Sequence, residues 1–145
     1  MEIAVNINKE VYSKILDIIP TIPPETGGIL GGKNDIITNF VFDTGLPNGD
    51  IGHYYPDIDK LNSCILDWQK HGIKFYGIVH SHLNHEKSLS LGDEVYIKEI
   101  MFAMPTDIKT LYFPIVFPRK EIIPYRAERE KDKLKIIFDG INIIF

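Results

Sequence analysis

Three stretches of the chain repeat apolar residues at the spacing of an α-helix, about 3.6 residues per turn. The first follows Asn8, a good helix-capping residue, and ends before Pro20. The second ends at Gly72, and the third covers about residues 92–104. The apolar residues of these three faces are Val11, Ile15, Ile18, Ile19, Ile58, Leu61, Cys64, Ile65, Trp68, Val95, Ile97, Ile100, Met101 and Met104. The pattern therefore predicts three helices, each with one face in the core.

Apolar runs bounded by glycine, proline and polar residues predict the strands. The strand-like segments are residues 26–32, 35–45, 73–82, 110–118, 121–128 and 133–145. The connection over residues 46–57 is rich in turn residues and has room for one more short strand. In the last segment, Asp139-Gly140 separates two apolar runs and predicts a hairpin. Helices interleaved with strands of mixed direction predict an α/β or α+β sandwich.

Length and composition favour one domain over residues 1–145, because 145 residues with 44% hydrophobic side chains can form a stable core and no repeat or linker divides them. The net charge of -4 gives no basic field for nucleic acid. The start of the chain lacks a signal-peptide pattern, and no run approaches the ~18 apolar residues of a membrane span, so no membrane partner is expected. A single cysteine, Cys64, excludes an internal disulfide and suits the cytoplasm.

Two histidines stand two residues apart where the 73–82 strand ends. Side chains at i and i+2 of a strand point the same way, so His80 and His82 can reach one divalent ion. Catalytic zinc usually takes three protein ligands, and Asp93, in the first turn of the next helix, is the candidate third. Ser90 and Asp93 also have the spacing of a capping box, and paired histidines can be ordinary hydrogen-bonded structure. The prediction of a metal site therefore depends on the combination of these residues.

Hydrolysis at such a site needs a base that does not bind the metal. Glu25 precedes a glycine-rich strand that allows a close backbone approach, although a glutamate there could also be an exposed loop residue. Glu86 and Glu94 are nearer in sequence to the histidines. However, Glu86 lies in a loop, and Glu94 points about 100° away from Asp93 on the helix.

Together these residues match the pattern E...H-[ST]-H-x7-S-x2-D, which resembles the JAMM motif of the JAB/MPN metalloprotease family. The segment ETGGILGG looks like that family's first strand, and the order of elements is similar over roughly residues 8–118. The resemblance is to the prokaryotic JAB-domain type. It implies an α/β, MPN/JAB-like (cytidine-deaminase-like) fold, with a mixed β-sheet packed with helices on both sides.

The resemblance also implies a role for each matching residue. His80, His82 and Asp93 would hold one zinc ion per chain, Glu25 would move a proton from the zinc-bound water to the leaving amine, and Ser90 would stabilise the oxyanion. The implied function is that of a cytoplasmic zinc-dependent isopeptidase or peptidase that removes or processes a ubiquitin-like modifier. The implied partners are the modifier or its conjugates, with activating and conjugating enzymes of ubiquitin type.

The chain departs from the family in the loop after the second histidine, where many members have proline and this sequence has Leu83. That difference bears on the shape of the loop. His85 follows closely and could contact the ligands or the substrate, or could simply be solvated.

Several other zinc or thiol chemistries are excluded by single positions. An H-E-x-x-H protease motif fails because Leu89 stands where the second histidine is required. A nucleobase deaminase needs two cysteines as ligands, and Cys64 stands alone on a face that the helical pattern buries. Two alternatives stay open: a non-catalytic MPN scaffold, and a zinc hydrolase of a small peptide-like or cysteine-conjugate molecule.

Overall fold

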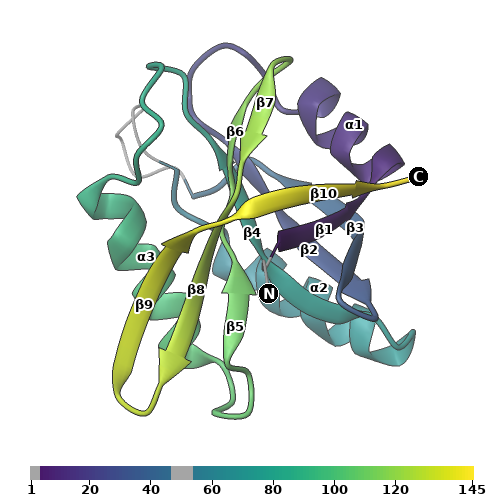
Figure 1. The fold of residues 1–145 in the computed structure, drawn as a ribbon, viewed down its shortest axis with the longest axis vertical. Coiled ribbons are helices and arrows are strands. Elements are labelled where there is room, and N and C mark those ends of the chain that lie inside the picture. The colour runs from purple at the N-terminus through teal and green to yellow at the C-terminus, as the bar shows by residue number, and fades with distance from the viewer. Residues whose placement is uncertain (1–3, 47–53) are drawn as a thin grey trace.

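The computed structural model describes residues 4–46 and 54–145, which form a ten-stranded mixed sheet and three helices (Figure 1). The helices are α1 (Lys9–Ile18), α2 (Ile58–Lys70) and α3 (Leu91–Ala103). The strands are β1 (Ala4–Asn8), β2 (Gly27–Lys33), β3 (Ile36–Asp43), β4 (Lys74–Ser81), β5 (Thr110–Tyr112), β6 (Ile115–Phe117), β7 (Glu121–Ile123), β8 (Tyr125–Glu130), β9 (Lys133–Phe138) and β10 (Gly140–Ile144). Among the described residues, no helix is long and apolar enough to cross a membrane.

The three predicted helices are confirmed, and polar caps set where each begins. The Asn8 side chain accepts hydrogen bonds from the first amides of α1, and Asp57 does the same for α2. The prediction for α3 was wrong in one respect. Val95 is exposed, and Tyr96 is buried in its place beside the expected Ile97. The predicted Ile97, Ile100 and Met101 are buried as expected, and Tyr96 brings a tyrosine hydroxyl into the interior.

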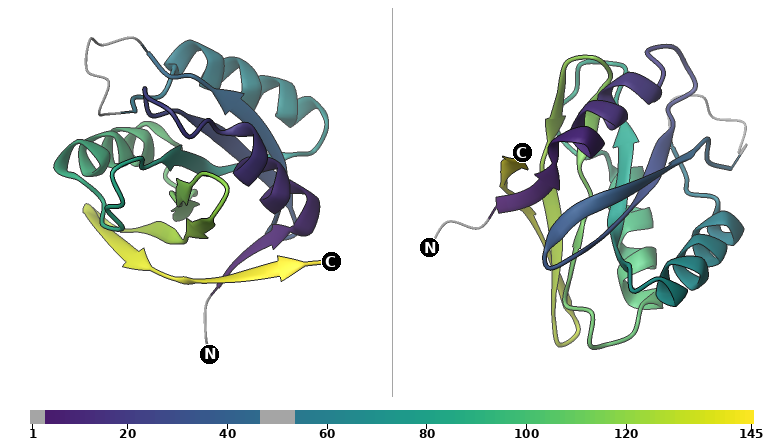
Figure 2. Two further views of the ribbon diagram at one scale, coloured as in Figure 1. Left: turned by 90° about the horizontal axis from the view of Figure 1, so that it is seen from above. Right: turned by 90° about the vertical axis from the view of Figure 1, so that its right-hand side faces the viewer.

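The strands follow the order β10-β1-β3-β2-β4-β5-β8-β9, and β6 and β7 branch from β4. Side chains alternate between two core clusters along the central strands. Leu30 and Val79 pack with α1 on one face, whereas Ile29 and Ile78 pack with α2 and α3 on the other. The predicted mixed sheet with helices on both faces is therefore present. Figure 2 shows that the sheet curls, so that β9 and β10 lie on the opposite side of the molecule from α2.

The predicted hairpin at Asp139-Gly140 was wrong. β9 pairs with β8, whereas β10 pairs in parallel with β1 at the other end of the sheet. The apolar runs on either side of Asp139 cover different clusters: Ile136 packs with α2 and α3, and Ile143 packs with α1.

The crossing is held by polar contacts that local turn propensity does not encode. The Asp139 carboxylate accepts from Arg126 Nε at 2.7 Å, and the Asp139 amide donates to the Pro124 carbonyl at 2.8 Å. The tight turn of this region lies instead between β8 and β9, where Lys131 has a φ of 54°. The possible short strand over 46–57 falls mainly on residues 47–53, outside the described part of the chain, and residues 54–57 are not in a strand.

Candidate metal centre

His80 lies in β4 and His82 directly follows it, at a point where neighbouring segments are hydrogen-bonded to both edges of the strand. His80 lies opposite Gly27 of β2, and the amides of His80 and His82 donate to the carbonyls of Pro114 and Val116 beside them. Gly27 is required for this arrangement, because a Cβ there would lie 2.3 Å from a carbonyl of β4 and 2.8 Å from the Tyr54 ring. The glycine-rich strand therefore allows a tyrosine to pack beside the first histidine.

His80, His82 and Asp93 meet as the sequence predicts, and all three are buried. The Nε2 atoms of the histidines lie 3.0 Å apart. Asp93 Oδ2 lies 3.0 Å from the Nε2 of His82, and Oδ1 lies 3.3 Å from that of His80. Ligands about 2.0–2.1 Å from a tetrahedral zinc ion stand roughly 3.3 Å apart. The three side chains thus fit three corners of such a site and leave the fourth for water.

Each imidazole is oriented by a contact at Nδ1, the ring nitrogen that faces away from Asp93. His80 Nδ1 lies 2.7 Å from the Tyr96 hydroxyl, and His82 Nδ1 lies 2.6 Å from the Glu86 carbonyl oxygen. A carbonyl can only accept, so His82 Nδ1 donates to it, and Nε2 is the nitrogen that faces Asp93 and the site. His80 likewise turns Nε2 toward Asp93 and Nδ1 toward the Tyr96 hydroxyl. Such contacts behind metal ligands fix their orientation and raise their basicity.

Asp93 joins the metal site to the start of α3. Ser90 Oγ accepts from the Asp93 amide at 3.1 Å, and Asp93 Oδ2 accepts from the Ser90 amide at 2.8 Å, which confirms the predicted capping box. Burial alone would raise the pKa of Asp93, but hydrogen bonds with His80 and His82 outweigh it and hold the pKa well below its usual range. Asp93 is therefore an anion both as a helix cap and as a candidate ligand.

Glu25 is buried rather than an exposed loop residue. Its Oε2 accepts from the Leu83 amide at 3.1 Å, which places the carboxylate beside the loop that follows His82. Burial raises the pKa of Glu25. The hydrogen bond from the Leu83 amide and the electrostatic effect of the nearby His82 each offset part of that rise. A carboxylate with a raised pKa is suited to general-base work near neutral pH.

Ser81, between the two histidines, anchors the residue next to this glutamate. Its Oγ accepts from the Thr26 amide at 3.0 Å, and its amide donates to the Thr26 carbonyl at 2.7 Å. The H-S-H sequence therefore supplies two candidate ligands and, from the opposite face of the strand, the attachment that positions Glu25.

Solved structures with a similar fold were found, whereas no family model and no curated protein matches the sequence. A protein from Desulfitobacterium hafniense aligns with a TM-score of 0.62 and 15% identity, over 95% of this chain and 93% of the other. A JAB1/MPN domain protein from Archaeoglobus fulgidus has a TM-score of 0.53 and 15% identity, over 96% and 97%. A protein from Salinibacter ruber has 0.54 and 14%, over 96% and 91%. The fold is MPN/JAB-like. At these identities the similarity concerns the fold alone.

Within this MPN/JAB-like fold, two tyrosines beside His80 were not predicted. The Tyr54 ring stacks on His80 with centroids 6.1 Å apart and planes 5° from parallel, and its hydroxyl donates to Asp43 Oδ2 at 2.6 Å. Tyr96 could have been found from its position three residues after Asp93, on the same side of a helix. Tyr54 has no comparable local signal, because its contact depends on Gly27.

His85 and Cys64 are the other two residues whose roles the sequence left to be decided. His85 is exposed, with a φ of 64°, and is not among the candidate ligands. Cys64 is half-buried against the cluster under α2, and burial raises the pKa of its thiol to about 11. Since the thiolate is the reactive form, the structure agrees with the exclusion of a cysteine nucleophile.

Proposed function

We propose that this protein is a zinc-dependent peptidase or isopeptidase of JAMM type. The observation that carries the proposal is the position of Glu25: a buried carboxylate, held by Leu83, beside a buried triad that it does not join. A zinc ion held by His80, His82 and Asp93 would polarise an amide carbonyl and acidify a water molecule.

The proposed roles of the protein groups follow from their hydrogen bonds. Glu25 takes the proton of the attacking water and returns it to the leaving amine. The Ser90 oxygen accepts from the Asp93 amide, so its O–H can donate to the oxyanion. The loss of one such donor typically costs about 3 kcal/mol of transition-state stabilisation. Asp93, with its lowered pKa, stays charged and coordinates rather than exchanging protons.

The proposed substrate is a ubiquitin-like modifier, as its precursor or its conjugate, in the cytoplasm and together with activating and conjugating enzymes of ubiquitin type. The motif resemblance supports this choice, as it does the assignment of the sheet to the cytidine-deaminase-like type. β7 offers a means of docking, because among the described strands it pairs only with β6. An extended tail could add to its other edge by backbone hydrogen bonds.

The test is hydrolysis of modifier fusions by purified protein with zinc or with a chelator. Activity with zinc that disappears on chelation is the expected result. Glu25→Gln should keep the metal and lose hydrolysis, whereas His82→Ala and Asp93→Ala should lose both. Stoichiometric zinc in the His82→Ala, Asp93→Ala double variant would contradict the ligand assignment, and full turnover by Glu25→Gln would remove Glu25 as the base.

The same measurements separate the alternatives. A non-catalytic scaffold would bind no zinc or would leave every fusion intact. A hydrolase of small peptide-like or cysteine-conjugate molecules would bind zinc and cut such molecules while leaving the fusions intact. The complete set of ligands, the glutamate and the serine favours an enzyme over a scaffold.

A further inference from the structure

A cleft of about 440 Å³ opens directly beside His82. The loop after β4 forms one wall, and the turn between β6 and β7 forms the other. The lining of the cleft includes His82, Leu83, Lys87, Phe117, Lys120 and Glu121. A substrate bound at the candidate metal site would therefore extend past these residues.

The lining is locally basic although the chain has a net charge of -4. Lys87 and Lys120 contribute two positive charges, and Glu121 is the one acid among the lining residues. Lys87 Nζ lies 3.5 Å from Glu121 Oε1, so this acid is already paired across the cleft. With Lys87 paired to Glu121, the positive charge of Lys120 remains to face the cleft.

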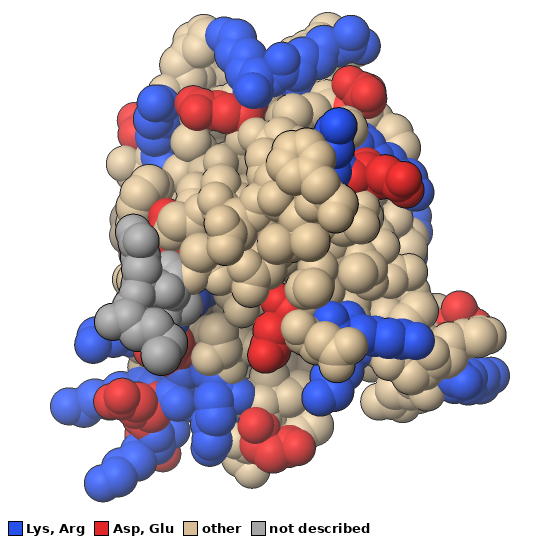
Figure 3. Space-filling model, turned by 45° about the vertical axis from the view of Figure 1, so that its right-hand side comes forward, with Lys and Arg blue, Asp and Glu red and all other residues tan. Residues whose placement is uncertain are grey.

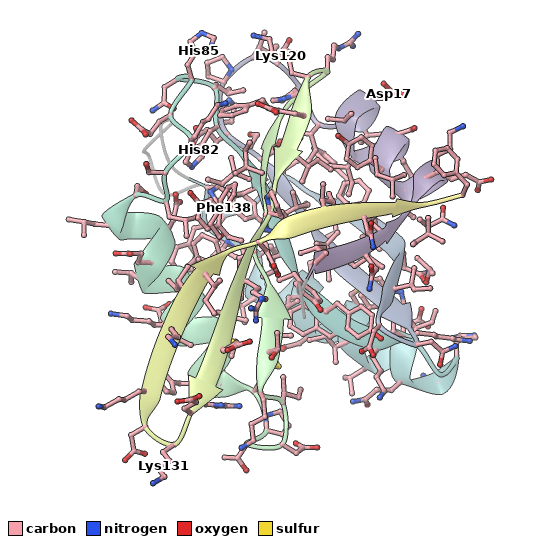
Figure 4. The ribbon with its side chains drawn as sticks, viewed as in Figure 1. Asp17, His82, His85, Lys120, Lys131 and Phe138 are labelled. Carbon is pink, nitrogen blue, oxygen red and sulfur yellow. The ribbon has the colours of Figure 1, made fainter. Side chains whose placement is uncertain are left out.

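The figures place this charge at one end of the molecule. Figure 4 shows His85 and Lys120 at the same end, with His82 deeper in the fold and Lys131 at the opposite end. In Figure 3, Lys and Arg side chains gather along the upper edge of the face shown, above a mostly uncharged centre. The loop between β4 and α3 carries one acid, Glu86, whose carboxylate accepts a hydrogen bond from the Ser88 amide at 3.2 Å.

Both walls are held in place by hydrogen bonds to the rest of the fold. The Tyr125 hydroxyl donates to the Lys87 carbonyl at 2.9 Å, and the Arg119 amide donates to the Leu16 carbonyl at 3.1 Å. Phe117 is buried and Leu83 half-buried, so they offer apolar contacts to the methylene groups of an entering side chain. A site held in this way requires little ordering on binding.

We propose that this cleft binds an acidic side chain of the substrate close to the scissile amide, so that the enzyme selects acidic peptide segments. The inference rests on the proposed function and states which substrates the proposed enzyme prefers. The bound carboxylate pairs with Lys120 and competes with Glu121 for Lys87. Exposed ion pairs of this kind give a preference of about threefold to tenfold for an acidic over a basic residue, and salt reduces it.

The test uses the zinc-loaded Glu25→Gln protein, in which binding is seen without cleavage. Two tetrapeptides, Ala-Ala-Glu-Ala and Ala-Ala-Lys-Ala with blocked ends, are titrated into ¹⁵N-labelled protein, and amide chemical shifts are followed. The acidic peptide is expected to bind about threefold to tenfold more tightly. Its largest shifts should fall in residues 83–87 and 117–121.

Lys120→Glu should abolish or reverse the preference, whereas Lys131→Glu, the same charge change at the other end of the molecule, should leave it intact. Equal binding of the two peptides, shifts centred elsewhere, no shifts at millimolar peptide, or equal losses in the two variants would overturn the inference. The titration needs no turnover. A protein that prefers the acidic peptide but cuts no fusion would therefore contradict the proposed function and leave the cleft assignment standing.

Discussion

The hydroxyl of Tyr96 lies 2.7 Å from Nδ1 of His80, and the two rings meet edge to face with centroids 5.6 Å apart. Tyr96 is fully buried, so its hydroxyl has this imidazole as a partner in place of water. The contact fixes which nitrogen of His80 faces the candidate metal. We expect Tyr96→Phe to lower zinc affinity by about 10- to 100-fold, measured by competition with a fluorescent chelator.

A matched control for this variant is Tyr12→Phe. This substitution also removes a tyrosine hydroxyl, but from α1, and Tyr12 packs against the core cluster on the other face of the sheet. Zinc affinity should not change in this control, and circular dichroism should show that both variants are folded. Unchanged zinc affinity in folded Tyr96→Phe would show that Tyr96 serves packing alone.

Leu83 gives a second prediction, because its amide donates to Glu25 Oε2. That hydrogen bond stabilises the carboxylate and so lowers its pKa against the effect of burial. Leu83→Pro removes the donor, and the pKa of Glu25 should rise. Since a base acts only when deprotonated, the acid limb of the kcat/KM profile should move to higher pH.

Leu83→Ala keeps the amide and is the control for loss of the side chain. Zinc content, measured on both variants, separates an effect on Glu25 from distortion of the neighbouring His82. An acid limb at the same pH in zinc-loaded Leu83→Pro and in the parent protein would argue against this role for the amide.

Much of the site was predictable because its signals are local. Strand parity brings His80 and His82 together, and a capping residue at Ser90 directs Asp93 back toward the sheet. Tyr54 and the tether from Ser81 to Thr26 were not predictable, since they depend on strands whose pairing the sequence does not specify. The Asp139 hairpin failed for the same reason. Its turn residues are local, but which core cluster each flanking run covers is decided by long-range packing.

The crossing between β9 and β10 can be tested through its ion pair. Arg126 and Asp139 are both buried, and Asp139→Ala would leave the guanidinium with Glu128 alone. We expect a loss of about 3 kcal/mol in the free energy of unfolding, measured in urea with a chelator present. Asp132→Ala, on the exposed turn before β9, should change it by less than about 0.5 kcal/mol. Similar stability of the two variants would mean that the pair is not important for the crossing.

The thiol of Cys64 gives a prediction about reactivity. With a pKa raised to about 11, only about one thiol in a thousand is ionised at pH 8, compared with roughly a quarter for a free cysteine. Alkylation by iodoacetamide in the folded protein should therefore be about 250-fold slower than in urea, as followed by mass spectrometry. Equal rates would show that the thiol is not shielded by the core. Cys64→Ser should hydrolyse substrate at the parental rate.

The pairing of β1 with β10 has a consequence for how the chain acquires its structure. Asn6 and Asn142 lie side by side although they are 136 residues apart in sequence. During synthesis β1 is made before β10, so this side of the sheet can close only after β10 has emerged. Contacts of such long range slow folding. We therefore expect the nascent chain to keep the edge of β1 unpaired until synthesis reaches β10, a period in which a chaperone could bind it.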